Sequence, residues 1–166
     1  MPFPIEKKLV IAVSSSAVFD MVAADRIFRD EGEDQYRKYQ LQHLNDPFEK
    51  GVAFPFISRL MRMNTIEELY KPIEVGVLSR TEPDSGRRFF RSCKHYGLAI
   101  SRGVFTNGKT PFKFMESFNA CLFLSAHDAD VRAAVKDGFP AGLVLPTEAT
   151  DDDEDLELRV AFDFDG

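Results

Sequence analysis

The stretch KKLVIAVSSS, residues 7–16, gives the first indication of the fold class. It is a short, continuous run of apolar and β-branched residues, which is typical of a strand buried on both faces of a sheet. Comparable runs recur at 73–79, 98–105, 120–126, 141–146 and 158–164. Segments with helical spacing lie between them, at 24–44, 54–63, 83–97, 110–119 and 128–138. Apolar strands that alternate with helices predict a mainly parallel sheet covered on both faces, which is a doubly wound α/β fold.

One connection in this series is much longer than the others. Residues 17–72 separate the first two predicted strands, and a plain crossover needs far fewer residues. The segment predicts a helical insertion over the sheet edge, with a break near Gly32, that forms a cap and shields a site from water.

Composition narrows the class of protein. The chain has 166 residues, 44% of them hydrophobic and 16 of them Phe, which favours a globular domain over a disordered one. The formal charge is −6, but residues 148–155 alone carry six acidic side chains, so the remainder is nearly neutral and predicts no nucleic-acid partner. No apolar run approaches the ~18–20 residues that a membrane span requires. Cys93 and Cys121 lack metal-binding spacing and indicate reduced thiols, as expected in the cytoplasm.

In a doubly wound fold, ligands bind beyond the carboxyl ends of the strands. Polar residues follow nearly every predicted strand at that position. They are Ser14–Ser16, Ser79–Thr81, Thr106–Lys109, Ser125 and the pair Asp163 and Asp165. The sequence therefore predicts a polar site at one edge of the sheet.

The last predicted strand repeats the first. AVSSSA, residues 12–17, aligns without a gap with AFDFDG, residues 161–166, so that Ser14 and Ser16 correspond to Asp163 and Asp165. One interpretation is that the chain holds one complete α/β unit and the start of a second copy. Two buried strands can also match by coincidence, and the pattern alone leaves both interpretations open.

An apolar strand that ends in D-x-D-G resembles the first motif of the haloacid dehalogenase (HAD) superfamily of phosphotransferases. The stretches IAVSSSAVFDM, HYGL, FTNGKTPF, LFLSAHDADVRAAV and LRVAFDFDG resemble the cytosolic 5'-nucleotidase type I family over nearly the whole chain. This resemblance implies a cytoplasmic, Mg²⁺-dependent phosphatase that acts on nucleoside 5'-monophosphates. In that family the D-x-D lies in the middle of the chain, so this sequence resembles an N-terminal half cut just after the motif.

The resemblance assigns roles to both carboxylates. Asp163 is expected to be the nucleophile that forms an aspartyl-phosphate, and Asp165 the acid that protonates the leaving ribose oxygen and later activates water. Both are expected to contact Mg²⁺, which offsets charge between carboxylate and phosphate. Alternate side chains of a strand point to one side, so both acids can reach one substrate. Without the resemblance, two acids that end a strand and meet solvent are the favoured explanation of the motif.

The first unit reads as a catalytically inactive HAD-like domain, because serine replaces both motif carboxylates. Its expected substrate-binding residues are Ser79, Thr81, Asn107 and Lys109. The expected domains are 1–146, an acidic linker at 147–155, and the start of a second half at 156–166. We expect this chain alone to be inactive, and its exposed last strand to favour a homo-oligomer. The alternative is a non-catalytic domain that binds a nucleotide or a partner chain.

Overall fold

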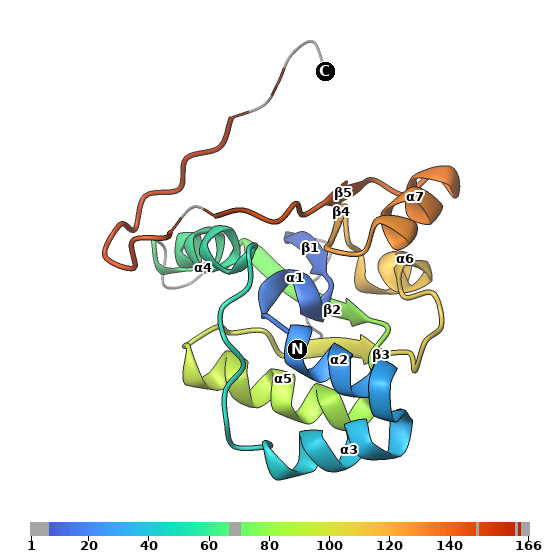
Figure 1. The fold of residues 1–166 in the computed structure, drawn as a ribbon. Coiled ribbons are helices and arrows are strands. Elements are labelled where there is room, and N and C mark those ends of the chain that lie inside the picture. The colour runs from blue at the N-terminus through green and yellow to red at the C-terminus, as the bar shows by residue number, and fades with distance from the viewer. Residues whose placement is uncertain (1–6, 67–70, 149, 162, 164–166) are drawn as a thin grey trace, which may run out of the picture.

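The computed structural model describes residues 7–66, 71–148, 150–161 and 163. These residues form a sheet of five parallel strands in the order β3-β2-β1-β4-β5 (Figure 1). The strands are β1 (Leu9–Val13), β2 (Ile73–Ser79), β3 (Arg102–Phe105), β4 (Leu122–Ser125) and β5 (Ala141–Leu143). The strand order reverses at β1, which pairs with β2 on one side and β4 on the other. The prediction of a doubly wound α/β fold is confirmed.

Helices account for most of the remaining described chain. They are α1 (Ser15–Val18), α2 (Val22–Glu31), α3 (Glu33–Gln42), α4 (Phe54–Arg62), η2 (Met63–Thr65), α5 (Pro83–His95), η3 (Phe112–Phe114), α6 (Met115–Phe118) and α7 (Asp128–Lys136). The long connection between β1 and β2 is helical, as predicted. Gly32 separates α2 from α3 with a φ of +85°, a conformation that favours glycine. None of the helices in the described parts of the chain combines the length and apolar character of a membrane span.

The pleat of the strands divides the core between the two faces of the sheet. Val13 and Val77 point to one face, where they pack with Phe89 and Cys93 of α5 and with residues of α1 and α4. Ala12 and Leu78 point to the other face and pack with η3, α6 and α7. Both faces are covered, which explains why these strands are apolar throughout.

Phe19, just after α1, lies at the centre of the larger core. Its side chain is fully buried, and its ring lies 5.3 to 6.1 Å from four other aromatic rings. Those rings belong to Phe48, Phe54, Phe89 and Tyr96. The cluster ties the insertion to α5 and so fixes where the insertion sits on the sheet.

The prediction of a sixth strand at 158–164 is wrong for the residues that the structure describes. Residues 158–161 and 163 belong to no strand, and the other positions of that range lie outside the described residues. A strand exists only through hydrogen bonds to a neighbour, and this segment runs away from the sheet (Figure 1). The third strand is also shorter than predicted, since Leu98 and Ile100 fill the core without joining the ladder.

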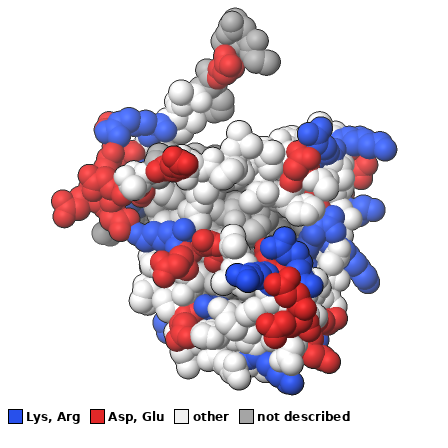
Figure 2. All heavy atoms as spheres, viewed as in Figure 1, with Lys and Arg blue, Asp and Glu red and all other residues white. Residues whose placement is uncertain are grey.

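The acidic linker contacts α4, although it contains no described helix or strand. The Arg59 Nε donates a hydrogen bond to the carbonyl of Asp155 at 2.9 Å, and its Nη2 donates to the carbonyl of Asp152 at 3.1 Å and to Asp151 Oδ1 at 2.8 Å. Lys50 Nζ donates to Asp153 Oδ2 at 2.6 Å. Figure 2 shows acidic side chains gathered with basic ones on this side of the molecule. We call the hydrogen bonds of Arg59 and Lys50 to residues 151–155 the Arg59 clasp. The described residues of the linker are therefore mostly exposed, and these contacts hold them against α4.

The two thiols are expected to differ sharply in reactivity. Cys93 is buried in the core, and this burial raises the pKa of its thiol to about 12, whereas Cys121 is exposed. Because the thiolate is the reactive form, a thiol reagent at pH 8 should modify one cysteine in the native chain and two after denaturation. Mass spectrometry of the labelled chain measures this. Rapid native labelling of Cys93 would contradict the packing described here.

Candidate functional site

A cavity of about 540 Å³ opens at the carboxyl ends of the strands, where the strand order reverses. Its floor consists of residues at the carboxyl ends of β1, β2 and β4, including Ser14, Ser79 and Ser125. Residues of α2 and α3, including Phe28 and Tyr36, line the opposite wall. The insertion therefore covers the edge of the sheet at which doubly wound folds bind ligands.

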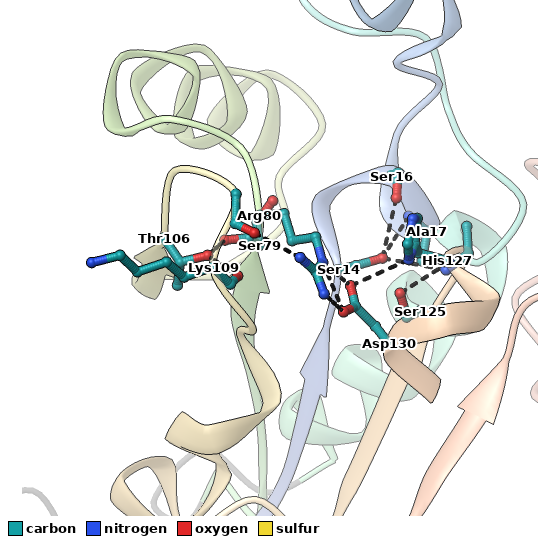
Figure 3. A network of polar contacts seen from close by, with 12 residues as sticks. Ser14, Ser16, Ala17, Ser79, Arg80, Thr106, Lys109, Ser125, His127 and Asp130 are labelled. Carbon is teal, nitrogen blue, oxygen red and sulfur yellow. Dashed lines mark hydrogen bonds and ion pairs between the residues drawn. The ribbon is translucent and has the colours of Figure 1, made fainter. Parts of the chain in front are cut away.

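Hydroxyl groups form the floor of the cavity. Ser15 Oγ and Ser79 Oγ are buried and lie 2.7 Å apart, and Ser79 Oγ lies 3.0 Å from Thr81 Oγ1. Ser14 Oγ accepts a hydrogen bond from the backbone N–H of Ala17 at 3.2 Å and lies 3.3 Å from Ser16 Oγ (Figure 3). Ser14 thus acts as the N-cap of α1. In this position it stabilises the turn after β1.

The Arg80 guanidinium crosses the cavity floor from the end of β2 to α7. Its Nε donates hydrogen bonds to Asp130 Oδ1 and Oδ2 at 2.7 and 2.8 Å, and its Nη1 donates to the carbonyl of Gly108 at 2.6 Å (Figure 3). The Asp130 carboxylate is buried, and its hydrogen bonds raise the pKa of Arg80. The pair neutralises a buried charge and leaves little of this guanidinium for a ligand.

Replacing Arg80 by Ala should therefore destabilise the fold. The change leaves the Asp130 carboxylate buried without its cation, which costs about 3–5 kcal/mol in fully buried pairs. Because the Arg80 side chain is 36% exposed, we expect a smaller loss, about 2–3 kcal/mol in the free energy of unfolding. Urea denaturation measures this loss. The double variant Arg80→Leu/Asp130→Leu should recover most of it, and a single variant as stable as the parent would contradict the role of the pair.

Glu82 forms a second ion pair at the rim of the cavity. Its Oε2 accepts hydrogen bonds from Arg37 Nε at 3.2 Å and Nη2 at 3.0 Å. Its Oε1 is buried and has no hydrogen-bond partner among the described residues. Nearby, Ser85 Oγ donates to Tyr36 Oη at 2.7 Å, and burial raises the pKa of this tyrosine. Glu82 therefore keeps one carboxylate oxygen buried in the protein without a described partner.

The structure brings together three of the four substrate-binding residues expected in the first unit. Ser79, Thr81 and Asn107 line the cavity, but Lys109 does not. The Lys109 side chain points away from the cluster in Figure 3, and its backbone carbonyl accepts a hydrogen bond from Thr106 Oγ1. Sequence reasoning missed Glu82, although its place three residues after a predicted strand was a usable signal.

The individual residues of the helical wall and Asp130 were also missed. Asp25, Phe28, Glu33 and Tyr36 of the insertion line the cavity, as does Asp130 of α7. The sequence predicted a helical cap over the sheet edge, but not which of its side chains face the cavity. The walls of the cavity withdraw the Asp25 carboxyl from solvent and raise its pKa, although its side chain keeps exposed surface.

The donor set of the cavity does not fit a Mg²⁺ ion. Within the described part of the chain, no three His, Cys, Asp or Glu side chains lie close enough to share a metal. Serines occupy the two positions that correspond to the motif carboxylates, and Arg80 already neutralises Asp130. Asp163 lies far along the extended segment and is exposed, and Asp165 lies outside the described residues. Asp163 is therefore not among the residues that line this cavity.

Comparison with known proteins gives the family. A family model described as 5'-nucleotidase matches residues 1–166. Human cytosolic 5'-nucleotidase 1B is 31% identical over 171 aligned residues, which cover 99% of this chain and 28% of the human protein. The chain thus spans about 28% of the length of that relative. The full-length match and this level of identity show that the chain belongs to the 5'-nucleotidase family.

Proposed function

We propose that the full-length protein containing this chain hydrolyses nucleoside 5'-monophosphates to nucleoside and phosphate. The family match over the whole chain carries this proposal, because it includes the apolar run that leads into Asp163. Membership in a family of hydrolases favours an enzyme over the non-catalytic binding domain. The name of the human relative supports a cytoplasmic location.

In the proposed mechanism, the Asp163 carboxylate attacks phosphorus and forms an aspartyl-phosphate. Asp165 protonates the leaving ribose oxygen and then deprotonates the water that hydrolyses the intermediate. Both carboxylates would hold a Mg²⁺ ion, which supplies positive charge against the substrate phosphate. The proposal places this chemistry in a second half that begins at residue 156, after a first unit at 1–146 and a linker at 147–155.

The first unit supplies the scaffold and part of the nucleotide pocket. Ser79, Thr81 and Asn107 line its cavity and are the proposed substrate contacts there. Lys109 stays a proposed contact only if its side chain turns toward the cavity when substrate binds. We also propose that the full-length protein forms a homo-oligomer.

Phosphate release from nucleoside monophosphates tests this function. We expect the full-length protein to release phosphate in Mg²⁺ and to lose activity when the metal is chelated. The 166-residue chain alone should release none, because it carries serines in place of the first unit's carboxylates. Full-length protein without activity on any nucleoside monophosphate would refute the proposal, and activity of the short chain would refute the assignment of the catalytic half.

A further inference from the structure

We propose that Lys50 and Arg59 form a binding site for an extended acidic peptide, and that two copies of the protein associate by exchanging residues 151–155 at this site. In the exchanged dimer, the acidic linker of each copy forms the Arg59 clasp with the other copy. The inference rests on the proposed homo-oligomer and names the surface through which the copies meet. It involves neither the D-x-D motif nor the cavity at the ends of the strands.

The charges of the binding site are divided between the body of the protein and the linker. A cavity of about 760 Å³ lies between α4, the turn after α5 and the linker. Its basic lining residues all come from the body, before β5, and are Lys50, Arg59, Arg62 and Lys71. The acidic residues of its described lining all come from the linker, and are Asp151, Asp153 and Asp155. The body therefore presents a basic surface that an acidic segment complements.

Arg59 recognises a polypeptide rather than a small anion. Its side chain is only 13% exposed, and two of its hydrogen bonds go to backbone carbonyls, from Nε to Asp155 at 2.9 Å and from Nη2 to Asp152 at 3.1 Å. A third goes from Nη2 to the Asp151 carboxylate at 2.8 Å. A small anion could replace the carboxylate, but it has no pair of carbonyls three residues apart. The partner that fits this guanidinium is therefore an acidic segment of a polypeptide chain.

The linker carries its bound shape in its own hydrogen bonds. The backbone N–H of Asp155 donates to the carbonyl of Asp152 at 3.0 Å, and the N–H of Glu154 donates to Asp152 Oδ1 at 3.0 Å. Turns of this kind form within one segment and need no neighbour. The contact between Lys50 and Asp153 is also open to solvent, since the Asp153 side chain is 71% exposed. The same segment can therefore meet the same donors on another copy.

The connection between the sheet and the linker permits the exchange. The backbone N–H of Val144 bonds to the carbonyl of Ser125, and Asp151 lies seven residues further along the chain. An extended stretch of that length reaches about 23–25 Å. In Figure 1 the chain leaves β5 and runs to α4 through this stretch, which contains no described helix or strand.

Symmetry closes the exchanged dimer. Two copies related by a two-fold axis each donate a linker and each receive one, so that both binding sites are filled. The contacts are the same as those within one copy, so the exchanged dimer is disfavoured only by the cost of bringing two copies together. It should therefore form increasingly as the protein concentration rises.

Isotope-coded cross-linking of the 166-residue chain, which contains both core clusters, α4 and the linker, tests the exchange. Equal amounts of unlabelled chain and of chain labelled with heavy nitrogen are mixed, concentrated and treated with a carbodiimide. The reagent joins the Lys50 amine to the Asp153 carboxylate where the two are in contact. Contacts within one copy give joined peptides of uniform isotope, whereas contacts between copies also give mixed pairs.

We expect mixed pairs, and their share should rise severalfold, up to about tenfold, when the protein concentration is raised tenfold. Mass spectrometry of the digested chain measures this share. Uniform pairs alone at every concentration, or no joined peptides at all, would overturn the proposal.

Complementary charge reversals test which residues are exchanged. A site variant, Lys50→Glu/Arg59→Glu, and a linker variant, Asp151→Lys/Asp153→Lys, each lose the ion pairs of the clasp within one copy. When the two are mixed, the linker of each matches the site of the other, so the ion pairs form only between copies. We expect the mixture to dimerise with a dissociation constant at least about tenfold below that of either variant alone. Sedimentation velocity measures the dimer.

Glu148→Lys/Glu154→Lys is the matched control for the linker variant. It makes the same change in charge at two exposed linker positions, neither of which is a described partner of Lys50 or Arg59. Mixed with the site variant, it should dimerise at least about tenfold more weakly than the linker variant does. Equal dimerisation of the two mixtures would reveal a general attraction of opposite charges and would overturn the proposal.

The outcomes separate this inference from the proposed function. If the site variant fails to fold, cross-linking of the parent sequence still decides the exchange. Phosphate release by the full-length protein without mixed pairs would refute only the exchange. Mixed pairs without phosphate release from any nucleoside monophosphate would refute only the proposed hydrolysis. A homo-oligomer that gives no mixed pairs would associate through another surface, which would overturn the present proposal.

Discussion

Replacing Asp163 by Asn in the full-length protein should abolish phosphate release. The carboxamide oxygen carries no charge and cannot form the aspartyl-phosphate, so we expect kcat to fall by at least about 10⁴-fold, as when other covalent nucleophiles are removed. KM should change much less, because substrate binding does not depend on the attack. Steady-state phosphate release, together with acid trapping of the phosphorylated enzyme, measures both effects.

Glu157→Gln provides the matched control. Glu157 is also an exposed carboxylate of the extended segment, six residues before Asp163, and its described partner is the exposed Arg159. Its replacement should leave kcat within about twofold of the parent, as expected for an exposed ion pair. Trapping of phosphate on the Asp163→Asn protein would show that another residue is the nucleophile. A loss of activity with Glu157→Gln would show that the assay reports on the segment's conformation.

Phe19→Ala should produce the largest loss of stability among single core substitutions. Truncation removes a fully buried ring that packs against four others, and the rigid surroundings would close the resulting cavity only in part. We expect a loss of about 3–5 kcal/mol in the free energy of unfolding. Phe19→Leu should lose less, because it refills most of the space. Urea denaturation of the isolated chain at 25 °C measures the series.

Phe114→Ala is the control for an aromatic residue outside the core. The Phe114 side chain is 40% exposed, so its removal should cost less than about 1 kcal/mol. If Phe19→Ala costs no more than Phe114→Ala, the aromatic cluster does not hold the insertion on the sheet. The expected difference between the two exceeds the error of the extrapolation to water.

The sequence predicted best the strands and helices whose position follows from the apolar pattern of their own residues. Strands β1, β2 and β4 and helices α5 and α7 lie where apolar runs and helical spacing placed them. The sixth strand was wrong because its apolar run says nothing about which neighbour would pair with it. An apolar sequence pattern predicts which residues are buried, but a strand also requires a neighbouring strand to which its backbone can hydrogen-bond.

The same distinction applies to the candidate site. The rule for doubly wound folds predicted that residues after the strands would meet, and Ser79, Thr81 and Asn107 do line one cavity. The partner of Arg80 is Asp130, fifty residues further along the chain, and no local pattern connects them. Which side chains of the predicted cap form the wall depends on tertiary packing, including the aromatic cluster around Phe19. These features could be found only in three dimensions.

The Arg59 clasp also shortens the free tether between the first unit and the proposed second half. From Leu143 to Asp163 the tether has 20 residues, but from Asp155, where Arg59 holds the backbone, it has eight. For a flexible tether, closure entropy scales as (3/2)RT ln n, so this shortening is worth about 0.8 kcal/mol. That corresponds to an effective concentration of Asp163, the proposed nucleophile, near the first unit that is about fourfold higher. By shortening the free part of the linker, Arg59 of α4 thus lowers the entropy cost of bringing Asp163 back to the first unit, without contacting Asp163 itself.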